Sequence, residues 1–453
     1  MGNESGCGEN FKLASEAVKE LDKSRLVHYE QMVDENGEFV PYLDVVSRMY
    51  CDTKYMEDFL SESKDPRPFI LCEYCHSMGN GPGDLKEYFD EINKSEKFIG
   101  GFIWEWKDHG VKFGKGGYKY GGDFSEINND SNFCIDGLIG PDLENKPSTI
   151  YLKQLYSGKS PESQKEKFKS ITFNKSKLKI IDAKRIYTVK LPDSEYKIDK
   201  ISGAITSIRR FNKEILKAPI TINIARAPID NERGITDKLQ RTGVFNAKQY
   251  STKAEVNNND IIFTGKLLAE SLSPRLEFTL TYTFYNEGVK IGLKYKIAEE
   301  FSNVPRVGIV FSTKKLKNAT FFGYGPQEAY VDNKELSMRG EFTLSAEDLF
   351  TNYIKPQECG SHCDTNYLTL DFNCYKMDVV ADKRFSFSVL PYSVDTLRNV
   401  RHSWELPKSY RSFVSLDVGM RGVGSYACGP ELPEKYEIDK EGFNNFYLMF
   451  YRN

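Results

Sequence analysis

The sequence predicts a chain of two parts: an α/β region with a parallel sheet of about four strands, then a large antiparallel β-sandwich. Two observations lead to this prediction. In residues 1–155, short apolar runs alternate with stretches of helical periodicity. Beyond about residue 185, apolar and polar residues alternate one by one between frequent turns, and no strong helical pattern interrupts them.

The first part has a regular order of expected elements. Strands are expected at short apolar runs over 25–30, 44–50, 68–74 and 99–106. Parallel strands end at the same edge of a sheet, so the polar residues at these ends should lie close together. Those residues are Glu30, Tyr50, Glu73, Trp104 and Glu105. Helices are expected over 9–22 and 83–94, where apolar residues recur with helical spacing.

The second part begins after a change in composition. Residues 156–190 are polar and rich in lysine, which indicates a linker or the remnant of a small immunoglobulin-like domain. Residues 191–453 are assigned to the sandwich. Within it, 276–285 and 289–297 alternate about a turn at Asn286–Gly288 and predict a β-hairpin.

Composition narrows the classes of function. Of 453 residues, 40% are hydrophobic and 28% charged, as in soluble globular proteins, and the net charge of −3 does not favour nucleic acid as a partner. No apolar run approaches the ~18 residues that cross a bilayer, and the first ten residues do not resemble a secretory signal. Nine cysteines, an odd number scattered along the chain, favour a reducing cytoplasm.

Glu4 and Glu73 are the candidate catalytic pair. Cleavage of a glycosidic bond with retention needs a nucleophilic carboxylate and a proton-donating carboxyl group about 5 Å apart. Glu73 ends an apolar strand, and Glu4 follows Asn3, whose amide could hold a sugar hydroxyl. Considered one at a time, either residue would more often be an ordinary solvated surface carboxylate.

A second motif competes for the same segment. Residues 72–76 read CEYCH, which matches a haem attachment pattern, and Cys72 and Cys75 could also form a redox pair or half of a zinc site. Haem attachment requires export, and a zinc site needs a second cysteine pair of suitable spacing. Buried structural thiols are therefore the favoured interpretation.

Several blocks together resemble the β-galactosidases of glycoside hydrolase family 2, most closely the long lacZ-type enzymes. In the first part these are NESGCG, PFILCEYCHSMGNGPGDLKEYFD, IGGFIWEWKDHG, YGGDF and NFCIDGLI. Later blocks, ARAPIDNE (225–232), YGPQEAYVDNK (324–334), YIKPQECGSHCD (353–364) and MRGVGSYACGP (420–430), resemble that family's C-terminal sandwich. The resemblance implies the second half of a (β/α)8 TIM barrel followed by the sandwich.

The resemblance also implies roles for single residues. Glu4 would be the general acid/base and Glu73 the nucleophile, with Tyr50 hydrogen-bonded to the nucleophile. Asn3 and His76 would contact sugar hydroxyls, Trp104 would lie under the galactose ring, and Tyr426 stands near an aglycone-lining position. Glu4 falls where the family binds Mg²⁺; the Phe133 main chain and Asp136 fall where it binds Na⁺.

The chain departs from the family pattern in what it lacks. The family's amino-terminal domains, the first half of its barrel and the remaining ligands of both metal sites have no counterpart here, and Asp136 stands where Asn is usual. We therefore expect a truncated or split chain, inactive alone or active with a complementary N-terminal fragment. The expected activity is cleavage of terminal β-D-galactosides such as lactose, in a homo-oligomer or with that fragment. A β-glucuronidase, or a non-catalytic fragment that binds carbohydrate or a partner subunit, is the alternative.

Overall fold

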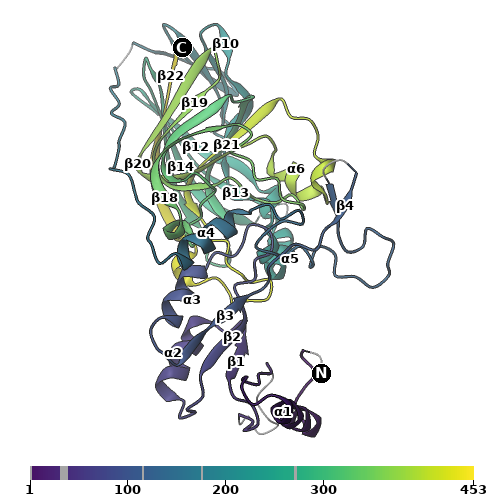
Figure 1. Ribbon diagram of the computed structural model, residues 1–453. Helices are drawn as coiled ribbons and strands as arrows, with labels where there is room; N and C mark the ends of the chain where they lie inside the picture. The colour runs from purple at the N-terminus through teal and green to yellow at the C-terminus, as the bar shows by residue number, and fades with distance from the viewer. Residues whose placement is uncertain (1–2, 31–38, 115–116, 175–176, 270–272, 453) are drawn as a thin grey trace.

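The computed structural model describes residues 3–30, 39–114, 117–174, 177–269 and 273–452. Figure 1 shows two parts: a small α/β part that carries the N-terminus, and a much larger β domain that carries the C-terminus. The two parts follow one another along the chain in the order that the sequence predicts. No helix in these described ranges is long and apolar enough to cross a membrane.

The α/β part contains a three-stranded parallel sheet of order β1-β2-β3. The strands β1 (Val46–Met49), β2 (Phe69–Tyr74) and β3 (Phe98–Ile103) confirm three of the four expected strands. Helices α1 (Glu9–Leu21) and α3 (Leu85–Ile92) confirm both expected helices. The remaining elements of this part are α2 (Thr53–Glu62), α4 (Pro147–Tyr156) and the short strand pair β4 (Val111–Phe113) and β5 (Gly117–Lys119).

The expected strand over 25–30 is wrong, because that segment forms no strand. Its backbone is held by single contacts: the amide of Val27 donates to the Asp44 carboxylate, and the amide of Asp44 donates to the Val27 carbonyl. Two hydrogen bonds to a single residue, Asp44, fix the segment as a loop. A β-strand would need successive backbone hydrogen bonds to a neighbouring strand. On this side, β1 has no strand neighbour among the described residues.

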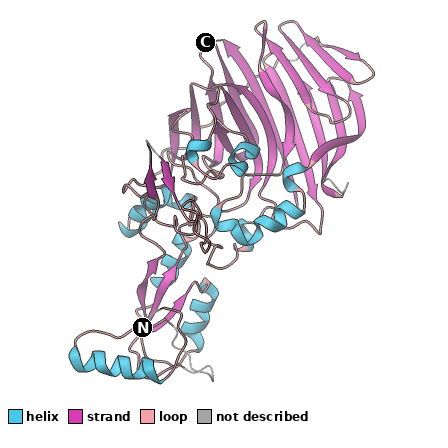
Figure 2. Cartoon of the chain, turned by 90° about the vertical axis from the view of Figure 1, so that its right-hand side faces the viewer, coloured by secondary structure: helices cyan, strands magenta, loops and turns pink. Residues whose placement is uncertain are grey.

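The β domain is a network of antiparallel strands whose pairings close into a ring. Figure 2 shows these strands as strongly curved layers. The strands are β6 (Lys179–Asp182), β7 (Ile186–Leu191), β8 (Ser194–Asp199), β9 (Ile205–Arg210), β10 (Lys213–Glu214), β11 (Leu216–Asn223), β12 (Lys248–Asn257), β13 (Asp260–Leu268), β14 (Pro274–Phe284), β15 (Gly288–Ile297), β16 (Arg306–Lys314), β17 (Asn318–Gly325), β18 (Met338–Ser345), β19 (His362–Asp371), β20 (Tyr375–Leu390), β21 (Arg411–Met420) and β22 (Glu441–Arg452).

The expected hairpin is confirmed by β14 and β15, which pair from Phe284↔Val289 outward to Leu276↔Ile297. Alternate residues of these strands are buried, as a period of two requires when one face covers a core. The long strand β20 pairs with β22 over its first half and with β21 over its last residues. It thereby joins the layers and helps to close the ring.

Short helices interrupt the β domain between its strands. They are α5 (Arg233–Arg241), α6 (Val394–Asn399) and the 3₁₀ turns η1 (Asp230–Glu232), η2 (Val244–Asn246), η3 (Lys334–Leu336), η4 (Ser403–Glu405) and η5 (Glu434–Tyr436). In Figure 1, α5 lies at the lower end of the β domain, and α6 lies on its right side beside β4 of the α/β part. The loops around these turns therefore supply the residues that meet the candidate site.

The polar segment 156–190 begins at the last residue of α4 and has no helix or strand over 157–174, whereas its last part, expected to be linker, forms β6 and most of β7 of the β domain. It lies along the outside of the β domain (Figure 1) and is held there by ion pairs and aromatic contacts. Glu166 accepts hydrogen bonds from Arg339, and the ring of Phe173 lies 4.4 Å from that of Tyr285, centre to centre. The segment predicted to be a linker is thus bound to the β domain along its length.

Candidate active site

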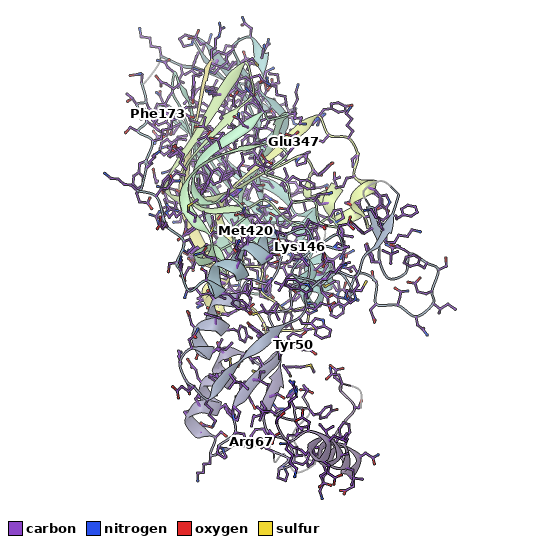
Figure 3. The ribbon with its side chains drawn as sticks, viewed as in Figure 1. Tyr50, Arg67, Lys146, Phe173, Glu347 and Met420 are labelled. Atoms are coloured by element: carbon purple, nitrogen blue, oxygen red, sulfur yellow. The ribbon has the colours of Figure 1, made fainter. Side chains whose placement is uncertain are left out.

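Glu73 and Tyr50 lie together at the end of the small parallel sheet. The Tyr50 amide donates to the Glu73 carbonyl at 2.9 Å, and the Tyr50 hydroxyl lies against the Glu73 carboxylate. Burial raises the pKa of Glu73; the charges of Glu4 and Glu30 add to this rise, whereas the Tyr50 hydroxyl opposes it. Burial and the same carboxylate raise the pKa of Tyr50 well above its usual range, so this hydroxyl remains a hydrogen-bond donor. Figure 3 shows Tyr50 between the small sheet and the β domain.

Glu4 lies on an exposed loop that precedes α1 and reaches the same end of the sheet. The amide of Ser5 donates to the Tyr29 hydroxyl at 3.0 Å, and the Asn3 amide lies 4.0 Å from the Met49 sulfur, at the end of β1. Because Met49 is the register partner of Glu73, this contact places the loop beside the catalytic candidate. The charge of Glu4 accordingly acts on Glu73, although the two residues are far apart in sequence.

His76 and Asp136 form the buried floor of this region. His76 is fully buried, its Nε2 lies 3.2 Å from the Asp136 carboxylate, and its ring stacks on Phe133 with 5.2 Å between centres. The contact is an ion pair without hydrogen-bond geometry, because neither ring nitrogen has a hydrogen-bond partner among the described residues. Burial alone would lower the pKa of His76, but Asp136 and the Cys428 thiol outweigh it and raise the pKa to about 9.

Trp104 and Glu105 close the site from the end of β3. The Trp104 indole donates to Asp136 at 3.1 Å and leaves 39% of the residue exposed, so its ring can meet a ligand. Burial, reinforced by Asp136, raises the pKa of Glu105 to about 8. Asp136 keeps a lowered pKa in spite of burial, because the His76 cation and the Glu105 carboxyl group lie against it. Two neighbouring carboxyl groups are thus held in different protonation states at neutral pH.

A loop of the β domain, residues 421–430, reaches this site. The buried side chain of Asn231 donates to the carbonyls of His76 and Gly424, both at 3.0 Å, and Ser425 donates to Asp84 at 2.7 Å. These contacts hold Cys428 beside His76. Tyr426 lies on the same loop, where its hydroxyl donates to Glu431, and it forms no hydrogen bond with Glu4 or Glu73 among the described residues.

The structure therefore brings eight of the nine predicted site residues to one end of the small sheet. They are Asn3, Glu4, Tyr50, Glu73, His76, Trp104, Phe133 and Asp136. Sequence reasoning named Glu105 among the strand-end residues expected to lie together but gave it no role, and it did not single out Asn231 or Cys428 for this site. Asn231 and Cys428 stand in the blocks ARAPIDNE and MRGVGSYACGP, which carried the resemblance and were the available signal.

The described residues do not complete either metal site that the resemblance implies. No group of three or more His, Cys, Asp or Glu in these ranges could hold a metal ion. Asp136 Oδ1 is buried without a hydrogen-bond partner, as a cation ligand could be, but its other oxygen faces His76 and Trp104. A single free oxygen beside a cationic imidazole does not make a Na⁺ site, and no step below depends on a metal.

The cysteines of CEYCH have separate surroundings. Cys75 is fully buried beside Asp84, and burial raises the pKa of its thiol well above the usual range. Cys72 is half-buried, and burial raises the pKa of its thiol to about 11. Both thiols are thus held in the protonated form at neutral pH, which does not favour a reactive or metal-binding pair.

The class of protein follows from both parts together: the partial parallel α/β barrel and the large antiparallel β domain each match a family model of the glycosidases. Two family models match this chain: "Beta galactosidase small chain" over residues 190–449 and "Glycosyl hydrolases family 2, TIM barrel domain" over residues 1–159. The chain belongs to the β-galactosidase family of glycosyl hydrolases family 2 and corresponds to about the C-terminal half of its full-length members.

Individual relatives agree with this assignment. The chain is 30% identical to a β-galactosidase of Actinobacillus pleuropneumoniae, over 99% of this chain and 54% of the relative. It is 26% identical to a β-galactosidase of Staphylococcus xylosus, over 99% of this chain and 56% of the relative. The chain thus spans about half the length of these relatives. A galactose mutarotase-like protein from Lactobacillus casei aligns over 59% of this chain and all of its own, with 10% identity and a TM-score of 0.37, which is too low to support an argument.

Proposed function

We propose that this chain supplies the catalytic half-site of a retaining β-galactosidase, with Glu73 as nucleophile and Glu4 as general acid/base. The observation that carries the proposal is the contact of Asn3, next to Glu4, with Met49, the register partner of Glu73, at the sheet end where the Tyr50 hydroxyl lies on the Glu73 carboxylate. A terminal β-D-galactoside such as lactose is the proposed substrate, in keeping with relatives that are named β-galactosidases.

The reaction would proceed in two displacements. Glu73 attacks the anomeric carbon while Glu4 gives its proton to the leaving oxygen, which forms a galactosyl-enzyme and releases the aglycone. Glu4 then takes a proton from water, the water oxygen attacks the same carbon, and Glu73 leaves as a carboxylate. Tyr50 and the His76 cation favour the ionised form of Glu73, which both attack and departure require.

The remaining predicted residues would position the sugar. Asn3 would hold the 2-hydroxyl, His76 would contact other galactosyl hydroxyls, and the exposed indole face of Trp104 would support the ring. Tyr426, on the loop from the β domain, would border the aglycone. Each role follows from the family resemblance, and the contacts described above are compatible with all four.

We further propose that a separate segment, which supplies further barrel strands, completes the site. Strand β3 is an edge of the described sheet, and its residues Ile99 and Phe102 are 48% and 66% exposed. Unpaired edges with apolar side chains are a template for further strands. The relatives are about twice as long as this chain, so their other half is the proposed occupant.

The test is an assay of a chromogenic β-galactoside with the purified chain, alone and mixed with the N-terminal half of the Actinobacillus pleuropneumoniae relative. We expect turnover in the mixture. The Glu73→Gln variant should lose at least about a thousandfold in kcat/KM, because no nucleophile remains. Glu96→Gln, which removes an exposed carboxylate elsewhere, is the matched control and should retain activity.

Two results would count against the proposal. If Glu73→Gln keeps nearly all the activity of the mixture, Glu73 is not the nucleophile. If the chain binds a non-hydrolysable galactoside in a calorimeter but no mixture turns over, the non-catalytic alternative is supported instead.

A further inference from the structure

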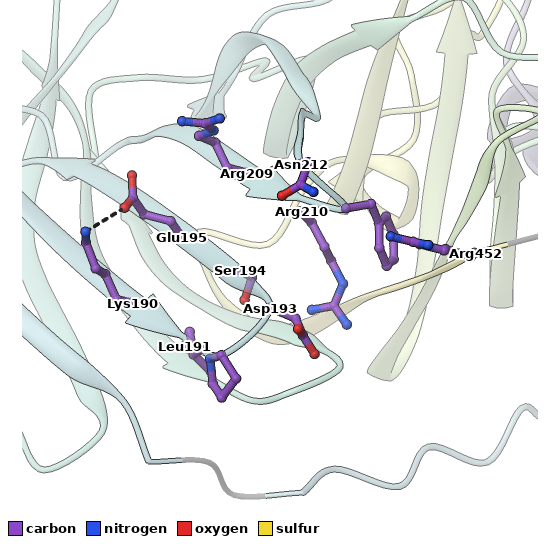
Figure 4. A pocket seen from close by; sticks show the side chains of 11 residues that line it. Lys190, Leu191, Asp193, Ser194, Glu195, Arg209, Arg210, Asn212 and Arg452 are labelled. Carbon is purple, nitrogen blue, oxygen red and sulfur yellow. Dashed lines mark ion pairs between the residues drawn. The ribbon is translucent and has the colours of Figure 1, made fainter.

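A cavity of about 500 Å³ lies at the end of the β domain that is remote from the candidate active site. The turns between β7 and β8 and between β9 and β10, together with the end of β22, form its walls (Figure 4). Cavities of this size hold small molecules. It is lined by Lys190, Leu191, Pro192, Asp193, Ser194, Glu195, Arg209, Arg210, Phe211, Asn212 and Arg452.

The cavity has more cationic than anionic lining residues. Lys190 and Glu195 neutralise one another in an ion pair at 3.3 Å, which Figure 4 marks with a dashed line. Three arginines then face one remaining carboxylate, Asp193. Neither Arg210 nor Arg452 forms an ion pair with another described residue of the chain. An arginine cluster without counter-charges is the usual composition of an anion site.

Two of these arginines are held close together by one ring. The guanidinium carbons of Arg210 and Arg452 lie 5.1 and 5.4 Å from the centre of the Phe211 ring. Each contact is a cation–π interaction, which fixes the direction of the guanidinium without neutralising its charge. Figure 4 shows Arg209, from the neighbouring position of β9, pointing away from this pair. Arg210 and Arg452 are therefore the cations that could grip one ligand.

Arg210 is fixed at the base of the cavity. It is only 8% exposed and donates to the carbonyl of Asn286 at 2.6 Å. Its side chain and that of Ser194 both lie against the buried Tyr196 hydroxyl. These neutral contacts hold the guanidinium in place without neutralising its charge.

From this geometry we infer that the cavity is a binding site for a phosphate monoester of a small molecule. The phosphate oxygens would accept from the guanidinium groups of Arg210 and Arg452, and Asn212 lines the same cavity as a further donor. The divalent group would also outweigh the charge of Asp193. A neutral sugar would leave both guanidinium groups without a counter-charge.

The test is calorimetric titration of the purified full chain at constant ionic strength with glycerol 3-phosphate, inorganic phosphate and glycerol. We expect saturable binding of the first two and none of glycerol. Arg452→Gln should weaken phosphate binding by about tenfold or more, as the loss of one charge-assisted hydrogen-bond donor predicts. Arg452 is exposed, so this variant should fold, and its circular dichroism and melting temperature verify that it does.

Arg241→Gln, an exposed arginine on α5, is the matched control and should bind like the original chain. Arg210→Lys is the second variant; it keeps the charge but removes the planar guanidinium, and should also weaken binding. The inference is overturned if inorganic phosphate and glycerol 3-phosphate give no saturable heat, or if Arg452→Gln binds as tightly as the control. Because the readout is binding at a remote cavity, the result is independent of β-galactosidase activity.

Discussion

The α/β part and the β domain differ in how far each can stabilise itself. Strands of the β domain pair in a closed ring around a large core that extends from Tyr187 to Phe450. The α/β part has three parallel strands, a smaller core, and large apolar side chains exposed along β3 and α1. The candidate chemistry nevertheless lies in the α/β part. The β domain therefore acts as the stable body against which an incomplete barrel is held.

The largest expected effect is the loss of stability when a buried phenylalanine is removed from the core of the β domain or of the α/β part. Phe446 of β22 and Phe69 of β2 are both fully buried, and each packs against other aromatic rings. Phe446→Ala should lower the free energy of unfolding of the β domain by about 3–5 kcal/mol. Phe69→Ala should cost a similar amount but only within the α/β part. Hydrogen exchange followed by mass spectrometry separates the two regions; equal loss of protection in both regions for Phe69→Ala would show that they unfold as one unit.

Two buried histidines, one in each region, have pKa values that are shifted in opposite directions. His76 faces Asp136 and has a pKa raised to about 9, whereas burial lowers the pKa of His362, between Phe321 and Phe387, to about 4. The unfolded chain binds a proton at His362 near pH 6.5 but the folded chain only near pH 4. The contribution of neutral His362 to the free energy of unfolding is therefore complete above pH 6.5 and decreases as the pH falls towards 4. At pH 5 about 2 kcal/mol of it is lost.

Urea unfolding at pH 7 and pH 5 measures this loss. His362→Gln keeps an amide that can donate to the Tyr324 carbonyl, as the imidazole Nδ1 does in one tautomer, but it has no proton to bind. This variant should show a smaller difference between the two pH values. An equal difference in both chains would assign the acid sensitivity to another group.

Removal of the hydrogen bonds that join the two regions is expected to have a smaller effect on stability. Asn231 is fully buried, and its side-chain amide joins His76 of the α/β part to Gly424 of the β domain. Asn231→Ala would leave two carbonyls without this donor, at a cost of about 1–3 kcal/mol. The melting temperature should fall, and hydrogen exchange should rise first around residues 76–84. Asn212→Ala, far from this contact, is the control; if it has the same effect, the bridge does not hold the regions together.

The sequence predicted what local pattern determines. Three strands, two helices, the hairpin and the convergence of strand-end residues at one edge follow from periodicity and parallel topology. The segment 25–30 does not form the expected strand: Asp44 holds it as a loop through Val27, and Leu26 is 63% exposed, which no periodicity reveals. Helix α2 was missed although Asp52 caps it and accepts from Tyr55, a signal that can be read from sequence.

The candidate site was predictable in part for a similar reason. Glu73 and Trp104 stand at strand ends, so topology places them together. Cys428 and Asn231 reach the same place from the β domain through contacts of very long sequence separation, and neither spacing nor composition encodes such contacts. The metal ligands named from the resemblance were not completed because their partners have no counterpart among the described residues.

The smallest expected effect concerns the segment that joins the two regions. The Glu166 carboxylate accepts from Arg339 at 2.6 Å and from Asn366 at 2.8 Å, and these donors, Arg339 first, lower its pKa to about 2. Because the Glu166 side chain is 39% exposed, Glu166→Gln should change the free energy of unfolding by less than about 1 kcal/mol. The segment itself should nevertheless loosen, and trypsin should cleave faster at its lysines. Glu162→Gln, an exposed neighbour, is the matched control. Equal cleavage of the two variants would mean that the aromatic contacts of Phe173, and not this ion pair, hold the segment to the β domain.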